Sequence, residues 1–195
     1  MCIRDRRYKD HELVNTIIHE TMHLELFIPS NADFNERMAV FVGNVGTEMF
    51  YRDKEGESSA TLRLIEEENF DDKIFSDFIS EEIRVIEKWY KELPESERSE
   101  DRRKERLRQI QQKFLAEIRP KLRTKNYDKF PNLELNNARL VMYKTYYKDL
   151  SEFEKLYKKT NSNFHLFLAE LRKLRNSKNP VHDLKKLTEN PVTPQ

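Results

Sequence analysis

The scarcity of glycine constrains this sequence most, because only three of its 195 residues are glycine. Strong helix formers take its place, with Glu, Lys, Arg and Leu repeated along most of the chain. Charged residues make up 36% of the sequence and hydrophobic residues 37%, which indicates a hydrophilic surface around a thin core. We therefore predict a mainly α protein, and we find no segment with the pattern of a β-strand.

Two helices on either side of a proline turn are predicted near the N-terminus. Hydrophobic residues recur every three to four positions over about residues 11–27, and Asp10 is a candidate N-cap. Pro29 disfavours helical geometry at the residue before it, so the first helix should end there. Asp33 is then the candidate N-cap of a second helix over roughly residues 34–51.

A long, charged helical hairpin is predicted in the middle of the chain. It follows a polar break at residues 52–59 and consists of two helices over about residues 70–93 and 100–123. Pro94 marks the joint, and Pro120 should kink or end the second arm. Each arm carries a narrow hydrophobic stripe between charged flanks, which is typical of antiparallel helices that pack together. The stripe residues are Ile83, Ile86 and Trp89 on the first arm, and Leu107, Ile110, Phe114 and Ile118 on the second.

The remainder of the chain is predicted to form short helices and a loosely held tail. The expected segments are a loop at 124–135, helices at about 136–148, 151–160 and 162–176, and a tail at 177–195 that contains three prolines. A chain of 195 residues suits one domain, so we predict a single domain over 1–195 in which the hairpin at 70–123 is an insertion.

Charge and hydropathy argue against several partners. Lys and Arg number 36 and Asp and Glu 35, so a formal charge of +1 gives no overall attraction to nucleic acid or to an acidic membrane. No apolar stretch approaches the roughly 20 residues that cross a bilayer, and the single cysteine, Cys2, cannot form an intrachain disulfide. The charged start, Met1–Arg7, does not resemble a signal peptide, and we expect a missing upstream segment, where any β-sheet would lie. The sequence favours no particular oligomeric state.

The pentapeptide H-E-T-M-H at residues 19–23 lies within the first predicted helix. Positions four apart share one face of a helix, so His19 and His23 can present two imidazoles to one ion. Glu20 lies about 100° further around the helix, where a carboxylate can act as a base beside a metal instead of binding it. Two neutral imidazoles and one carboxylate leave a fourth position open for water, and this ligand set favours Zn²⁺.

Glu36 is the predicted third ligand. It follows His23 by thirteen positions, and the break at Pro29 allows the chain to reverse, so that Glu36 falls in the first turn of the second helix. The positive end of that helix dipole favours an ionised carboxylate there. The alternative interpretation is a capping box between Asp33 and Glu36, with both histidines as ordinary surface or core residues.

Further motifs follow on either side of the predicted hairpin. In the stretch 13–46, F-N-E occurs at 34–36 and A-V-F-V at 39–42, while N-N-A-R-L occurs at 136–140 and T-Y at 145–146. In these places, and in its H-E-x-x-H helix, the sequence resembles the predicted bacterial zinc aminopeptidase family. The resemblance covers both ends of the chain and leaves the charged hairpin between them.

The resemblance implies a gluzincin-like metallopeptidase that acts on a peptide substrate. Glu20 would be its catalytic base, and the zinc ligands would be His19, His23 and Glu36. Members of the family often begin with a lipoprotein-type export signal, which implies a periplasmic or membrane-anchored location. The sequence departs from many members at Gly43-Asn44, where those carry an acidic pair.

The second matched segment adds candidates for catalysis and substrate binding. Tyr146 could donate a hydrogen bond to the tetrahedral oxyanion, and the alternative is that it packs at an interface with neighbouring tyrosines. Asn136 and Asn137 could bind the substrate backbone, and the alternative for at least one of them is to cap the helix that begins there. Asn35 is a candidate for orienting a ligand.

Other classes of function remain as alternatives. An aminopeptidase needs an acidic group for the substrate's α-amine, and neither Glu25 nor Glu48 is singled out by its spacing, so an endopeptidase is possible. A non-catalytic helical interaction protein could dock a partner on the charged hairpin, although most charged faces are simply solvated. The third alternative is an inactive, truncated fragment that still binds zinc.

Overall fold

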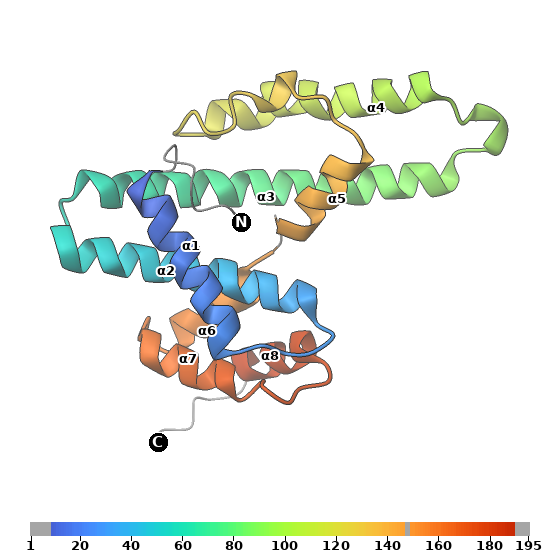
Figure 1. Ribbon diagram of the computed structural model, residues 1–195. Coiled ribbons are helices and arrows are strands. Elements are labelled where there is room, and N and C mark those ends of the chain that lie inside the picture. Colours follow the sequence, from blue (N-terminus) through green and yellow to red (C-terminus); the bar gives the residue numbers. More distant parts are fainter. Residues whose placement is uncertain (1–8, 147–148, 190–195) are drawn as a thin grey trace. The chain divides into compact units, whose positions relative to one another are not determined.

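The computed structural model describes residues 9–146 and 149–189, except for the side chains of residues 145 and 146. Every regular element in this part of the chain is a helix, so the predicted mainly α class is confirmed (Figure 1). The helices form two compact units. The first unit contains the described residues up to Ile65 and those from Asp149 onward, and the second contains Glu66–Lys148.

The first unit is organised around two helices that cross, α1 (Asp10–Glu25) and α2 (Ala32–Glu55) (Figure 1). Three short helices from the C-terminal part complete it, namely α6 (Ser151–Lys159), α7 (Phe164–Arg172) and α8 (Pro180–Glu189). All five helices contribute apolar side chains to one core. Aromatic rings connect α2 to α6 and α7 in this core, through Phe34, Phe41, Phe153 and Phe167 with centroid distances of 5.3–6.0 Å.

The predicted loose tail at 177–195 is wrong for the residues that the structure describes. Pro180 begins α8, at a helix position where its missing N–H has no cost. Leu184 is 1% exposed and belongs to the core of the first unit. The hydroxyl of Thr188 donates to a carboxylate oxygen of Glu152 at 3.1 Å, which ties α8 to α6. The three prolines of this segment led to the prediction of a loose tail where an amphipathic helix forms. Residues 190–195 lie outside the described part of the chain.

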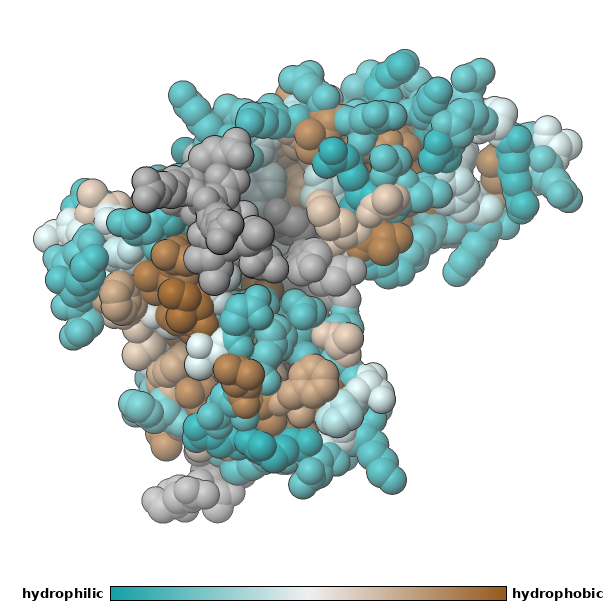
Figure 2. Space-filling view, in the orientation of Figure 1, coloured by the Kyte–Doolittle hydropathy of each residue, from teal (hydrophilic) through white to brown (hydrophobic). Residues whose placement is uncertain are grey.

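The second unit contains the predicted antiparallel hairpin. Its arms are α3 (Ala60–Glu92), from residue 66 onward, and α4 (Glu100–Lys113), with the 3₁₀ turn η1 (Glu95–Glu97) directly after Pro94. The predicted stripes of both arms lie in one core, where Phe114 contacts Phe75 and Phe78. The outer surface of this hairpin is hydrophilic (Figure 2), as the charged flanks of its stripes predict.

The second arm loses regular α geometry before Pro120. Residues Phe114–Ile118 form a π-helical turn, η2, and Arg119–Lys121 form the 3₁₀ turn η3. Proline has no N–H with which to continue an α-helical ladder, so the hydrogen-bond pattern changes here. After Leu122, the buried carboxylate of Asp71 accepts the backbone N–H groups of Arg123 and Thr124 at 2.8 and 2.7 Å.

The rest of the second unit covers the open side of the hairpin. Tyr127 stacks on Phe75 with a centroid distance of 4.1 Å. The 3₁₀ turn η4 (Phe130–Asn132) and helix α5 (Asn137–Tyr146) follow. The side-chain amide of Gln111 donates to the carbonyl oxygens of Phe130 and Leu133 at 2.9 and 2.8 Å, so a helix side chain satisfies the loop backbone.

Several predicted boundaries differ from the structure. Helix α2 continues through the first half of the predicted break at 52–59, because Arg, Lys and Glu favour a helix as well as a loop. It ends at Gly56, which adopts a φ of 83° that other residues rarely tolerate. Helix α3 begins at Ala60, not near residue 70, and the hydroxyl of Ser59 accepts the N–H of Leu62 at 3.1 Å.

The two predicted aspartate caps are also wrong. Asp10 is the first residue of α1, and the flanking Lys9 donates its backbone N–H to Glu12 at 3.1 Å. Asp33 is the second residue of α2, which begins at Ala32. Acidic residues favour the whole first turn of a helix and not only its cap, so both positions remain electrostatically suitable.

Candidate metal centre

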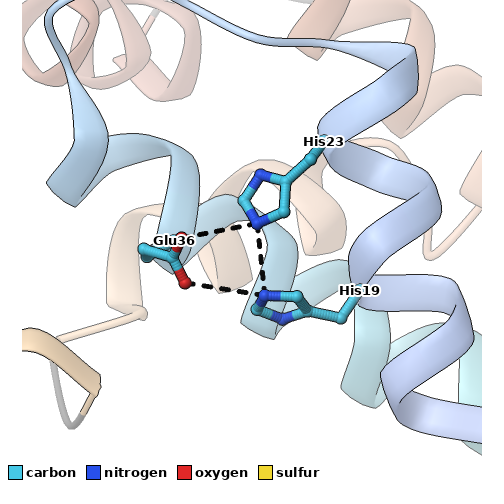
Figure 3. Close-up of side chains that lie close together, drawn as sticks. All are labelled: His19, His23 and Glu36. Carbon is cyan, nitrogen blue, oxygen red and sulfur yellow. Dashed lines mark hydrogen bonds and ion pairs between the residues drawn. The ribbon is translucent and has the colours of Figure 1, made fainter. Parts of the chain in front are cut away.

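The two histidines of the H-E-x-x-H motif lie side by side on α1. Their Nε2 atoms are 3.2 Å apart, and their ring centroids are separated by 4.9 Å at an interplanar angle of 80°. This pairing follows directly from their spacing of four residues, because one helical turn brings such positions above one another. Both Nε2 atoms face α2 (Figure 3).

The connection between α1 and α2 reverses the chain within six residues. Helix α1 ends where Leu26 leaves helical geometry, with a φ of −143° and a ψ of 114°. The turn includes Pro29 and then Ser30, whose φ is 63°. Asn31 folds its side chain back onto the carbonyl oxygen of Pro29 at 2.9 Å. The predicted proline-broken bend is therefore present.

Glu36 lies opposite the histidine pair (Figure 3). Its carboxylate oxygens are 3.5 Å from Nε2 of His19 and 3.4 Å from Nε2 of His23. Because α2 begins at Ala32, Glu36 is in the second helical turn and not, as predicted, in the first. The alternative capping box with Asp33 is wrong, because Asp33 is inside the helix and the Glu36 carboxylate faces the imidazoles.

The donor atoms of the three side chains lie at separations close to those around one tetrahedral ion. A tetrahedral ion with ligands at roughly 2.1 Å holds neighbouring ligand atoms roughly 3.4 Å apart. The two Nε2 atoms are 3.2 Å apart, and the Glu36 carboxylate approaches them with different oxygens, Oε2 at 3.5 Å from His19 and Oε1 at 3.4 Å from His23. Among the described residues, His19, His23 and Glu36 are the group of ligand-type side chains that could hold a metal ion.

The donor set itself also suits a cation. Two Nε2 atoms at 3.2 Å can share only one proton, and a carboxylate adds a further acceptor to the same space. Burial lowers the pKa of His19, and the neighbouring His23 lowers it further, while Glu36 and Glu20 oppose this shift. The neutral imidazole that metal binding requires is thus favoured by the surroundings.

The site is partly open to solvent. The exposed fractions of the side chains are 17% for His19, 20% for His23 and 30% for Glu36. This exposure leaves room for a further ligand beyond the three protein groups. On the opposite side, Nδ1 of His23 is buried and makes no hydrogen bond within the described part of the chain. Most metal-bound histidines donate this second ring nitrogen to a protein or water acceptor.

Glu20 lies on the exposed side of α1, next to the histidine pair. Its carboxylate is near enough to His19 to favour the protonated imidazole, but it is not in the group of possible ligands. Hydrophobic side chains reach the surface along the same helix (Figure 2), with exposed fractions of 43% for Leu13, 56% for Ile17 and 89% for Leu24. Glu20 therefore occupies an accessible position between the histidines and an apolar stripe.

The other predicted site residues belong to the second unit. Asn136 precedes α5 and accepts the backbone N–H of Arg139 at 3.0 Å, so the predicted capping role is confirmed for this residue. Asn137 is the first residue of α5. Tyr146 is the last residue of that helix, and its side chain lies outside the described ones. The substrate and oxyanion roles of these residues remain predictions.

Sequence reasoning missed the contacts that bring α1 and α2 together. A Cβ atom on Gly46 would lie 3.0 Å from Cγ2 of Ile18, so the missing side chain allows a close helix crossing next to His19. Asn15 donates to Asn44 across the same crossing at 3.0 Å. Gly43 and Asn44, which stand where many family members carry an acidic pair, thus pack against Asn15 of α1 in this chain. The spacing of Gly43 and Gly46 could have suggested the crossing.

Arg37, directly after Glu36, anchors α2 to the C-terminal part of the first unit. Its guanidinium donates two hydrogen bonds to the carbonyl oxygen of Asp149, one of them at 2.9 Å from Nε. The guanidinium also lies 5.8 Å from the centroid of the Phe153 ring. Nothing in the sequence pattern indicated this contact, because 112 positions separate the two partners.

One comparison with known proteins places the chain in a family. The family model described as "Putative aminopeptidase" matches residues 4–185, which is nearly the whole chain. The protein belongs to this family. Searches of curated proteins and of solved structures found no match. No helix in the described part of the chain has both the length and the apolar character needed to cross a membrane.

Proposed function

We propose that the protein is a zinc-dependent peptidase, with His19, His23 and Glu36 as the zinc ligands. The observation that carries this proposal is the convergence of the three side chains, with separations of 3.2–3.5 Å that match the edges of a tetrahedral site. Membership of a family described as aminopeptidases supports peptide-bond hydrolysis as the reaction.

Each residue has a distinct task in this proposal. A zinc ion held by His19, His23 and Glu36 would supply Lewis-acid chemistry, which would make water more acidic and polarise the carbonyl group of a bound peptide. Glu20 is the general base: it accepts a proton from the attacking water and passes it to the departing amine. Its exposed position on α1 leaves the carboxylate accessible to a substrate. Tyr146 is proposed as a donor to the oxyanion, and Asn137 as a contact to the peptide backbone.

The choice between an aminopeptidase and an endopeptidase rests on the family, not on a described side chain. An aminopeptidase holds the substrate's α-ammonium group with an acidic residue. Glu25 is engaged elsewhere, because it forms an ion pair with Arg172 at 2.8 Å and accepts a hydrogen bond that lowers its pKa. We therefore do not assign Glu25 to this task.

The test combines metal analysis with peptide hydrolysis in the purified protein. We expect one zinc per chain, and release of N-terminal residues from short peptides. Glu20→Gln should keep the zinc and lose hydrolysis by several orders of magnitude, because it removes the base but none of the ligands. His23→Ala is the matched control on the same helix and should lose both zinc and hydrolysis.

Four results would contradict the proposal in different ways. A protein without zinc would favour a helical interaction protein. Zinc that is bound without any hydrolysis would favour an inactive zinc-binding protein. Full hydrolysis by Glu20→Gln would mean that another group serves as the base. Internal cleavage of long peptides, with no release of terminal residues, would replace the aminopeptidase by an endopeptidase.

A further inference from the structure

Asn35 makes an unusual contact directly before the proposed ligand Glu36. Its side chain is fully enclosed in the first unit, with 1% exposure. The amide oxygen of Asn35 accepts the backbone N–H of Ile28 at 3.0 Å, and the amide nitrogen donates to the carbonyl oxygen of the same residue at 2.9 Å. One side chain thus satisfies both backbone groups of a residue in the turn.

The backbone of Ile28 depends on this contact. Ile28 lies outside the helices and is 1% exposed, so water does not reach its polar groups freely. Its carbonyl oxygen also accepts a longer bond from the N–H of Asn31, at 3.3 Å. Buried backbone groups without partners are costly, so the amide of Asn35 favours this one arrangement of the turn over others.

We infer that Asn35 is a positioning residue that sets Glu36 opposite His19 and His23. The inference rests on the proposed function only in taking Glu36 as a metal ligand. Between the histidine pair and Glu36, the chain leaves helical geometry at Leu26 and regains it at Ala32. The six residues from 26 to 31 therefore decide where α2 begins relative to α1. Asn35 is the fourth residue of α2 and directly precedes Glu36. Its two hydrogen bonds to Ile28 therefore fix the middle of this turn to the start of α2.

A double-mutant cycle separates positioning from general support of the fold. Zinc affinity is measured by competition with a chelator for the wild type, Asn35→Ala, Glu36→Ala and the double variant. We expect Asn35→Ala to weaken zinc binding by about 10- to 100-fold, the usual effect of removing a residue that orients a ligand. In the Glu36→Ala background the same change should have no further effect, because the group that Asn35 positions is gone.

The matched control is another asparagine of the first unit. Asn163 caps α7 by accepting the N–H of Leu166 at 3.0 Å, and its own N–H donates to the carbonyl oxygen of Thr160 at 3.0 Å. Asn163→Ala should lower stability without changing zinc affinity. If Asn35→Ala weakened zinc binding equally with and without Glu36, or did not weaken it at all, the positioning role would be refuted.

A second variant and a measurement without metal keep the test decisive. If Asn35→Ala does not fold, Asn35→Asp replaces it in the cycle, because it retains an acceptor for the N–H of Ile28 while it loses the donor and adds a negative charge. The added charge is present with and without Glu36, so only the part of its effect that depends on Glu36 reports positioning. In zinc-free protein at constant pH, the imidazole NMR signals of His19 and His23 report the nearby carboxylate. Asn35→Ala should shift them as Glu36→Ala does, and should shift them no further in the double variant. A wild type that binds no zinc would refute the proposed function, while these signals would still decide the role of Asn35.

Discussion

Two clusters of three ionisable side chains, one taken from each unit of the protein, are satisfied in different ways. In the second unit, Glu82 is almost fully buried and accepts from Arg106 at 3.1 Å and from Lys113 at 2.6 Å. Two cations and one anion satisfy one another, so the cluster is complete within the protein. In the first unit, two imidazoles and the Glu36 carboxylate direct acceptor atoms at a common point.

This difference distinguishes a structural cluster from a candidate binding site. The Glu82 cluster joins α3 to α4 and needs nothing from outside the chain. The cluster of His19, His23 and Glu36 has an excess of acceptors, and a cation is the group that would satisfy all three at once. A lack of complementary donors within a cluster, and not the number of charges in it, is therefore the feature that points to a ligand.

The largest effect that we predict concerns the metal. Zinc at about 1,000 times its dissociation constant should stabilise the first unit by about 4 kcal/mol, because it binds the folded ligands together. The second unit should gain nothing, since all three ligands belong to the first. Hydrogen exchange of α2 and of α4, with zinc and with a chelator, measures the change in stability of the first and of the second unit. Equal protection of α2 in the two conditions would show that the acceptor cluster does not bind zinc.

Glu82→Gln tests whether the cluster of Glu82, Arg106 and Lys113 stabilises the second unit. The substitution keeps the shape but leaves Arg106, which is 17% exposed, and Lys113 without their anion. We expect a loss of about 2–3 kcal/mol in the stability of the second unit, below the range for fully buried pairs because Lys113 is 42% exposed. Denaturant unfolding followed at α4 gives this value. Zinc affinity should not change, and a change would mean that the Glu82 cluster also contributes to metal binding.

The parts of the site that the sequence predicted are those set by local rules. The His19–His23 pair follows from helical periodicity, and the bend follows from Pro29. The sequence could not show that Asp33 lies inside α2, because the pattern D-x-x-E fits a capping box as well as an ordinary first turn. The break at 52–59 was placed too early, because only Gly56 interrupts the helix formers around it.

Other features depended on partners that are distant in the sequence. The amide of Asn35 finds its backbone partner seven residues earlier, and Gly46 matters only because Ile18 approaches it. The helix α8 was missed because the three prolines of the segment 177–195 suggested a loosely held tail. Its stability comes from the burial of Leu184 in the core of the first unit. Tertiary packing decided each of these outcomes, and apart from the spacing of Gly43 and Gly46 no local pattern indicates it.

Gly46→Ala probes the close crossing of α1 and α2, with a smaller expected effect. The added Cβ would lie 3.0 Å from Cγ2 of Ile18 and 3.2 Å from its Cδ1, so α1 must shift beside His19. We expect a loss of about 1–2 kcal/mol in the stability of the first unit and weaker zinc binding. In an Ile18→Ala background the two close contacts are removed and the remaining Cβ lies 3.9 Å from the added methyl, an ordinary contact, so the same substitution should stabilise the helix instead. The absence of this change of sign in thermal unfolding would argue against the crossing.

Asn136→Ala has the smallest expected effect, and it distinguishes the two roles proposed for this residue. Its amide oxygen accepts the N–H of Arg139 at 3.0 Å, so the substitution removes the cap of α5 and should cost about 1 kcal/mol in the second unit. Asn136→Asp keeps a capping acceptor and should restore the stability, whereas a contact that requires the amide N–H₂ would not be restored. If capping is its only task, both variants hydrolyse peptides with the KM of the wild type. A higher KM in both variants, with full stability in Asn136→Asp, would instead assign Asn136 to substrate binding and connect the second unit to the chemistry of the first.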